Sequence, residues 1–191
     1  ADAGEILATK RAAIEDLEHW QYSPEQVRAW APKDSYLDTF EQAIDTDRFV
    51  VHVAEDDGTI VGYGALNVPD ERIDAVYVHP DHHGKGIATV LVKQLELSAK
   101  FQGIVELDVM AAKNAVAFYR SVGYWRLDDE VTTIEDVDLE LVRMRKDIDL
   151  TDLDVDADES AASEEWFDLE ECFDDDSDPD EWFGSAAEIE E

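Results

Sequence analysis

Residues 76–88 read Val-Tyr-Val-His-Pro-Asp-His-His-Gly-Lys-Gly-Ile-Ala, and this stretch is the most informative about the fold. The β-rich run of residues 73–78 precedes it, and apolar residues at helical spacing begin at Ile87. A glycine turn between a strand and a helix lets backbone N–H groups approach an anion, and the helix N-terminus adds a partial positive charge. Residues 83–88 therefore predict an anion cradle, to which Lys85 adds a cation.

The glycine spacing excludes two other phosphate-binding motifs. A Walker loop has four residues between its glycines and a following Lys-Ser or Lys-Thr, whereas one residue separates Gly84 from Gly86. The Rossmann pattern Gly-x-Gly-x-x-Gly is also missing. A plain strand-to-helix turn, with glycine present for steric reasons, is the alternative interpretation.

Hydrophobic periodicity and turn residues predict the elements around this turn. Asp57-Gly58 is typical of a tight hairpin, and a helix between the third and fourth strands makes those two strands parallel. We therefore expect an α/β fold (α+β in some schemes), with a mixed, mostly antiparallel sheet and helices on both faces. The predicted helices are 5–20, one from Ser23-Pro24, 87–102 ending at Gly103, and 115–121 ending at Gly123; the predicted strands are 49–53, 60–66, 73–78, 104–109, 124–127 and 139–144.

The composition is strongly acidic. The chain has 191 residues, with 49 Asp and Glu against 15 Lys and Arg, and its formal net charge is -34. This charge opposes binding to nucleic acid or anionic membranes and suggests a halophilic source, where salt screens self-repulsion. No apolar run is long enough to span a bilayer, so we expect a cytoplasmic protein. The single cysteine, Cys172, excludes a disulfide framework.

The last 45 residues differ from the rest. Residues 147–191 contain 21 acids and no Lys or Arg, so we expect residues 1–146 to form one domain and residues 147–191 an acidic tail. Within this tail Glu165-Trp166-Phe167 recurs as Glu181-Trp182-Phe183. The tail is either a solvated halophilic extension or an interaction segment that docks on the body or on a protein partner. The sequence also leaves open whether two copies of the chain form a homodimer.

Two motifs in the right order resemble the GNAT N-acetyltransferase superfamily. Positions 83, 86 and 88 match its acyl-CoA signature Arg/Gln-x-x-Gly-x-Gly/Ala, although His83 replaces the usual Arg or Gln. Residues 114–124 match its second signature, in which Asn opens a helix and Phe-Tyr precedes Gly-Tyr. The resemblance covers roughly residues 5–146, and the usual first strand before helix one is absent or shortened.

The resemblance implies that acetyl-CoA binds where the third predicted strand splays from its parallel neighbour. The backbone of that strand would pair with the pantetheine arm as an added strand does. No metal is expected, because a loop beside a phosphate cradle already explains His79, His82 and His83. The implied cofactor-binding residues are Val76, Tyr77, Val78, His83, Gly84, Lys85, Gly86, Ile87, Ala88, Asn114 and Tyr119.

Catalysis would need a proton acceptor and a proton donor. Glu71 and Asp74 are candidate acceptors because both lie at the start of the third strand, and strict alternation places Asp74 on one face with Val76 and Val78. Tyr119 would protonate the departing thiolate. The alternatives are solvated surface acids, a tyrosine that only packs, and a role for Asn114 as a helix N-cap.

The predicted function is N-acetyl transfer from acetyl-CoA to a primary amine of a small molecule or peptide. Direct attack needs no covalent intermediate, which accords with the lack of a cysteine in the body. A cationic acceptor suits the negative body. The alternative is an acyl-CoA-binding regulatory or scaffolding module whose acidic tail binds a partner.

Overall fold

The computed structural model describes residues 3–17, 21–33, 35, 37, 41–42 and 46–151. The repeated Glu-Trp-Phe elements predicted in the tail lie outside these residues, as do residues 18–20 of the first predicted helix.

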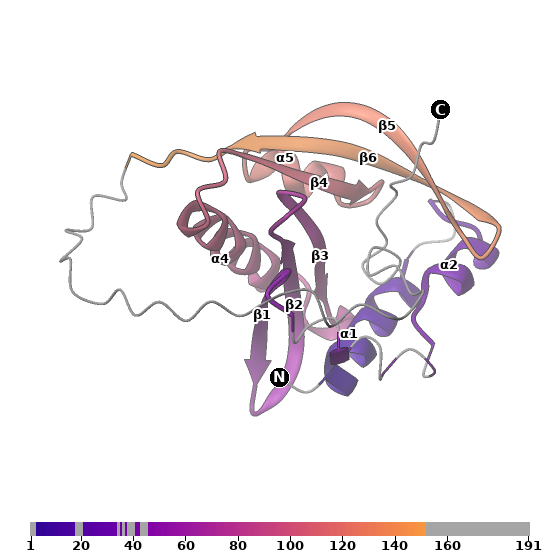
Figure 1. The fold of residues 1–191 in the computed structure, drawn as a ribbon. Coiled ribbons are helices and arrows are strands. Elements are labelled where there is room, and N and C mark those ends of the chain that lie inside the picture. The colour runs from indigo at the N-terminus through magenta and orange to yellow at the C-terminus, as the bar shows by residue number, and fades with distance from the viewer. Residues whose placement is uncertain are drawn as a thin grey trace, which may run out of the picture.

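A six-stranded sheet forms the centre of the fold (Figure 1), with the strand order β1-β2-β3-β4-β6-β5. Neighbouring strands are antiparallel except for the parallel pair β3 and β4, as predicted. The elements are α1 (Ala3–Glu15), α2 (Pro24–Trp30), β1 (Phe49–Asp56), β2 (Thr59–Asn67), β3 (Arg72–Val78), the 3₁₀ turn η2 (Pro80–His82), α4 (Ile87–Phe101), β4 (Glu106–Ala112), α5 (Val116–Ser121), β5 (Trp125–Ile134) and β6 (Val137–Asp147).

Helices cover both faces of the sheet (Figure 1). On one face, Val92, Leu95 and Ala99 of α4 share a buried cluster with residues of α5, β3, β4 and β6. Helix α4 lies so close to β2 at Gly64 that a Cβ atom there would lie 2.8 Å from Cδ1 of Leu95. Glycine at this position permits the close approach. On the other face, α1 packs against β2 and β3, and α2 contacts β6. No helix in the described part of the chain is long and apolar enough to cross a membrane.

The hairpin turns differ in how visible they are in the sequence. Asp57 and Gly58 join β1 to β2 with φ angles of 51° and 79°, as the Asp-Gly pair predicts. Glu135 and Asp136 join β5 to β6 with φ angles of 50° and 63°, although neither is glycine. The two strands run up to this turn and are longer than the predicted strands 124–127 and 139–144.

The helix boundaries also refine the predictions. Helix α1 ends at Glu15, earlier than the predicted residue 20. Ser23 caps α2 as predicted, and its hydroxyl accepts a hydrogen bond from the backbone of Gln26. The side chain of Gln26 accepts one from the backbone N–H of Ser23, which completes a capping box.

Asp108 of β4 joins three strands. Its backbone N–H donates to the carbonyl of Glu71 just before β3, at 3.0 Å. Its carboxylate accepts hydrogen bonds from Arg143 and Arg145 of β6, the shortest at 2.5 Å. Burial alone would raise the pKa of Asp108, but the hydrogen bonds and charges of the two arginines hold it below its ordinary value.

We predict that Asp108→Asn destabilises the fold by about 2 kcal/mol at neutral pH, because Arg143 and Arg145 lose the hydrogen bonds that they donate to this largely buried carboxylate. Because the pKa of Asp108 is lower in the folded than in the unfolded protein, its carboxylate stabilises the fold at pH values above the ordinary Asp pKa. This stabilisation is lost as the pH falls through the folded-state pKa. The difference in the free energy of unfolding between the unsubstituted protein and the Asp108→Asn variant should therefore become smaller below about pH 4. Urea unfolding at pH 7 and pH 3.5 at one salt concentration measures both values.

Asp129→Asn is the matched control, because Asp129 pairs with Arg126 on the exposed surface of β5. Its effect should stay within about 0.5 kcal/mol. Equal effects of the two substitutions at pH 7 would contradict the role given to Asp108.

Candidate functional site

A gap opens between the two parallel strands. β3 and β4 pair only at Arg72 with Asp108 and at Ile73 with Val109, although each strand is seven residues long. On its other side β3 stays paired with β2 as far as Val78. The strands therefore diverge toward their carboxyl ends, and one edge of β3 borders the gap.

A β-bulge in β3 makes one prediction wrong. Ala65 of β2 pairs with Ala75, and Leu66 pairs with Ile73, so Asp74 has no partner on β2. The bulge breaks the alternation: Ile73 and Val76 pack in the α4-side cluster, whereas Ala75 packs in the α1-side cluster. The charge of Asp74 acts on the buried Lys10 of α1, so Asp74 lies on the α1 side and does not share a face with Val76.

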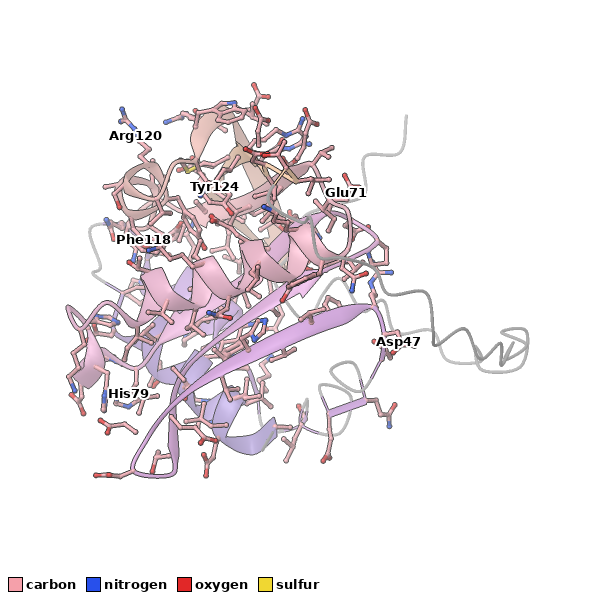
Figure 2. All side chains as sticks on the ribbon, turned by 90° about the vertical axis from the view of Figure 1, so that its left-hand side faces the viewer. Asp47, Glu71, His79, Phe118, Arg120 and Tyr124 are labelled. Carbon is pink, nitrogen blue, oxygen red and sulfur yellow. The ribbon has the colours of Figure 1, made fainter. Side chains whose placement is uncertain are left out.

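The two candidate proton acceptors have different surroundings. The Asp74 side chain is fully buried, and its carboxylate accepts hydrogen bonds from Asn67 at 2.9 Å and Arg72 at 2.5 Å. Glu71 is exposed, and its backbone has a φ angle of 52°. Figure 2 shows Glu71 at the end of the molecule opposite His79, so Glu71 lies at the closed end of the gap.

The glycine turn follows the open end of β3. Gly84 and Gly86 have φ angles of 74° and 81°, and added Cβ atoms would meet nothing within 4 Å. The backbone conformation therefore requires glycine here, whereas crowding does not. Gly86 is the N-cap of α4 and forms no side-chain capping bond. The first N–H groups of α4 are left for an anion or water.

A hollow of about 330 Å³ lies at this turn. Basic side chains gather around it: Lys85 Nζ lies 3.1 Å from Nδ1 of His82, and Nε2 of His83 lies 3.0 Å from the carbonyl oxygen of Val78. Among the described residues, no group of three or more His, Cys, Asp or Glu could hold a metal ion. The lining residues are Val78, His82, His83, Gly84, Gly86, Ile87, Ala88, Thr89 and Phe118.

Tyr119 on α5 is buried, with 5% of its surface exposed. Its ring packs edge-on against Phe118 and Tyr124, with centroid separations of 5.1 and 5.4 Å. Burial raises the pKa of Tyr119, and the nearby Tyr77 of β3 raises it further. Its hydroxyl forms no hydrogen bond with another described residue. A neutral phenol available to donate therefore lies near β3.

Asn114 is not the N-cap of α5. That position is Ala115, and no side chain caps the helix. The capping interpretation of Asn114 is therefore wrong, and its side chain is exposed. Phe118, the residue before Tyr119, lines the hollow, and neither it nor Thr89 was among the predicted cofactor-binding residues.

Lys10 of α1 is a third residue that was not among the predicted site residues. It is 4% exposed, and its Nζ lies 5.6 Å from the centroid of the Tyr77 ring. Burial lowers the pKa of Lys10 to about 8, against the opposing effect of the Asp74 charge. Its position with Ile6 and Ile14 at helical spacing was a signal that it faces the core.

Comparisons with known proteins agree with this geometry. The family described as Acetyltransferase (GNAT) domain matches residues 19–148. An acetyltransferase from Yersinia pestis (strain Pestoides F) is 30% identical over 110 residues, which cover 55% of this chain and 75% of the relative.

Solved structures share the fold. A GCN5-related N-acetyltransferase from Rhodopseudomonas palustris is 32% identical, with a TM-score of 0.71 over 76% of this chain and 89% of that one. The PaiA N-acetyltransferase of Thermoplasma acidophilum, solved with coenzyme A, is 19% identical, with a TM-score of 0.58 over 76% and 92% of the two chains. The match over residues 19–148 and the shared sheet together show that this chain belongs to the GNAT acetyltransferase family.

Proposed function

We propose that the protein transfers the acetyl group of acetyl-CoA to a primary amine of a small molecule or peptide by direct attack. The observation that carries the proposal is the position of the gap. It opens between β3 and β4 toward the carboxyl end of β3, and the glycine turn and the N-terminus of α4 follow directly. An extended thioester with a diphosphate at one end suits this arrangement.

In the proposed complex the cofactor lies along β3. The N–H groups of Gly84, Gly86 and the first turn of α4 bind the phosphates, and Lys85 adds charge. The pantetheine arm pairs with the edge of β3 from Val76 to Val78, which β4 leaves unpaired. Phe118 closes the hollow on the α5 side, and the exposed amide of Asn114 is a further cofactor contact.

The proposed reaction conserves its protons. The neutral amine nitrogen attacks the thioester carbon, the C–S bond breaks, and Tyr119 donates its proton to the departing thiolate. The nitrogen loses one proton to an acceptor, and solvent returns one to Tyr119. Because burial raises the pKa of Tyr119, this phenol stays protonated until the thiolate forms. A backbone N–H near Val76 or Tyr77 stabilises the oxyanion.

Of the two carboxylates, Glu71 is the better proton acceptor. Asp74 already accepts from Asn67 and Arg72, so its contribution is to hold the bulged start of β3. Glu71 is exposed at the closed end of the gap, so in this proposal it receives the proton through a chain of waters along the gap. The excess of acids over bases, 49 against 15, favours an acceptor that is cationic in solution.

The direct test mixes the full chain with acetyl-CoA and a panel of amines in molar KCl and follows the release of free thiol. Cys172 contributes one constant thiol per chain, which is subtracted. Amine-dependent release supports the proposal. Binding of acetyl-CoA without release for any amine would overturn it and favour the regulatory module.

We predict that Gly86→Ala weakens acetyl-CoA binding about tenfold, because alanine at a positive φ angle costs about 1–2 kcal/mol and the turn must distort. Isothermal titration calorimetry measures the affinity. Gly103→Ala is the matched control, since Gly103 has a φ angle of 76° and open space at the opposite end of α4. An equal loss of affinity in both variants would contradict the assigned site.

We predict that Tyr119→Phe lowers kcat by about 10²–10⁴-fold, because a general acid is removed while the ring still packs. The Kd of acetyl-CoA should stay unchanged. Tyr124→Phe removes a hydroxyl from the neighbouring buried ring, and its kcat should be normal. Steady-state kinetics at a fixed pH compares them, and a normal kcat for Tyr119→Phe would remove Tyr119 from the mechanism.

We predict that Glu71→Gln lowers kcat about 10²-fold with unchanged unfolding, because the proton acceptor is lost from an exposed position. Asp74→Asn should instead lower the midpoint of thermal unfolding, because Arg72 loses a buried partner. The kcat and the unfolding midpoint of both variants check this division. The reverse pattern would assign the proton to Asp74.

A further inference from the structure

Helix α4 is apolar on two sides. Leu91, Val92, Leu95 and Ala99 face the sheet and are buried. A second row follows the outer side of the helix at spacings of seven and four residues and continues just beyond it. We call this row the outer stripe: Val90, Leu97, Phe101 and Val105, whose exposed fractions are 58%, 44%, 65% and 53%. Figure 2 shows this side of α4 toward the viewer.

The charge of α4 is unusual for this chain. The helix carries two lysines, Lys93 and Lys100, and one acid, Glu96, which binds Lys146 at 2.8 Å. Lys93, Leu97 and Lys100 lie at helical spacing on the same side. In a chain with 49 acids and 15 bases, a face that is both apolar and basic suits an occupant that is both aromatic and acidic.

The tail begins beside this face. Ile148, just after β6, donates its N–H to the carbonyl of Val105 at 2.8 Å and packs against the core. Hydrogen bonds from Thr151 lower the pKa of Asp149, and the charge of Lys100 lowers it further. The described chain therefore ends next to the carboxyl end of α4, where the outer stripe ends.

We infer that residues 152–191 dock on the outer stripe of their own chain, with Trp166-Phe167 and Trp182-Phe183 on the apolar side chains and the flanking acids near Lys93 and Lys100. Fourteen residues lie between Thr151 and Trp166, so the two can be up to roughly 50 Å apart when the chain is extended. The stripe from Val90 to Phe101 is about 16 Å long. The linkage supplies an effective concentration in the millimolar range.

A second copy of the body suits this face less well. A symmetric contact through this face would bring the lysines of one copy near those of the other and would place two acidic bodies together. The segment from residue 152 onward has many acids, no Lys or Arg, and two pairs of large aromatic residues. Its aromatic residues suit the apolar side chains of the outer stripe, and its acids suit the charges of Lys93 and Lys100.

The experiment uses Cys172, the single cysteine, which lies between the two Trp-Phe pairs in the sequence. A benzophenone maleimide is attached to it in the full chain, the sample is irradiated in molar KCl, and the cross-linked peptides are mapped by mass spectrometry. The expected products are intramolecular cross-links to residues 90–105. Cross-links spread over the body, or products of two chains joined through α4, would overturn the inference.

Matched variants sharpen this test. Leu97→Gln with Phe101→Gln, and separately Trp166→Ser with Trp182→Ser, should each lower the yield of these cross-links at least fivefold. Val131→Gln is the control, because Val131 on β5 is 57% exposed and lies outside the outer stripe. Equal yields in all variants would also overturn the inference. Circular dichroism checks folding, and because acetyl transfer is not measured, the outcome is independent of the proposed function.

Discussion

Asp108 lies where the hydrogen-bonded pairing between the parallel strands β3 and β4 is fixed, just before the two strands separate. Its N–H bonds to the carbonyl before β3, and its carboxylate bonds to two arginines of β6. The pairing of β3 with β4 ends one residue later. The sheet is thus fixed at one end of this pair and open at the other, and both the hollow and the glycine turn lie toward the open end. The opening of the gap between β3 and β4 and the stability of the sheet therefore both depend on the short pairing at Asp108.

Much of the fold could be predicted because local chemistry determines it. Asp57-Gly58 accepts positive φ angles, Ser23 caps a helix, and Gly103 follows one, so these boundaries are visible in the sequence. The turn at Glu135 and Asp136 has positive φ angles without a glycine. Pairing along β5 and β6 supports this turn, and such long-range support has no local sequence signal.

The site shows the same division. Gly84 and Gly86 were identifiable because their spacing after a strand has a physical meaning. The bulge at Asp74 could not be predicted, because it depends on hydrogen bonds from Asn67 and Arg72 that form only in the folded sheet. The alternative role of Asn114 as an N-cap rested on its residue type, yet the N-cap of α5 is Ala115. Helical spacing puts Lys10 on the core-facing side of α1, but it gives no sign of the Asp74 charge that acts on it in the folded protein.

His83 replaces the Arg or Gln of the family signature, and its contact shows what the exchange changes. Its ring nitrogen reaches the carbonyl of Val78, so the first residue of the signature fastens the turn to the last residue of β3. A loop closed by its own side chain is ordered before a ligand arrives, and less conformational entropy is lost on binding. An arginine would contribute attraction to the phosphates, whereas this histidine contributes rigidity. In the proposed complex, this residue would favour binding by ordering the loop beforehand rather than by charge.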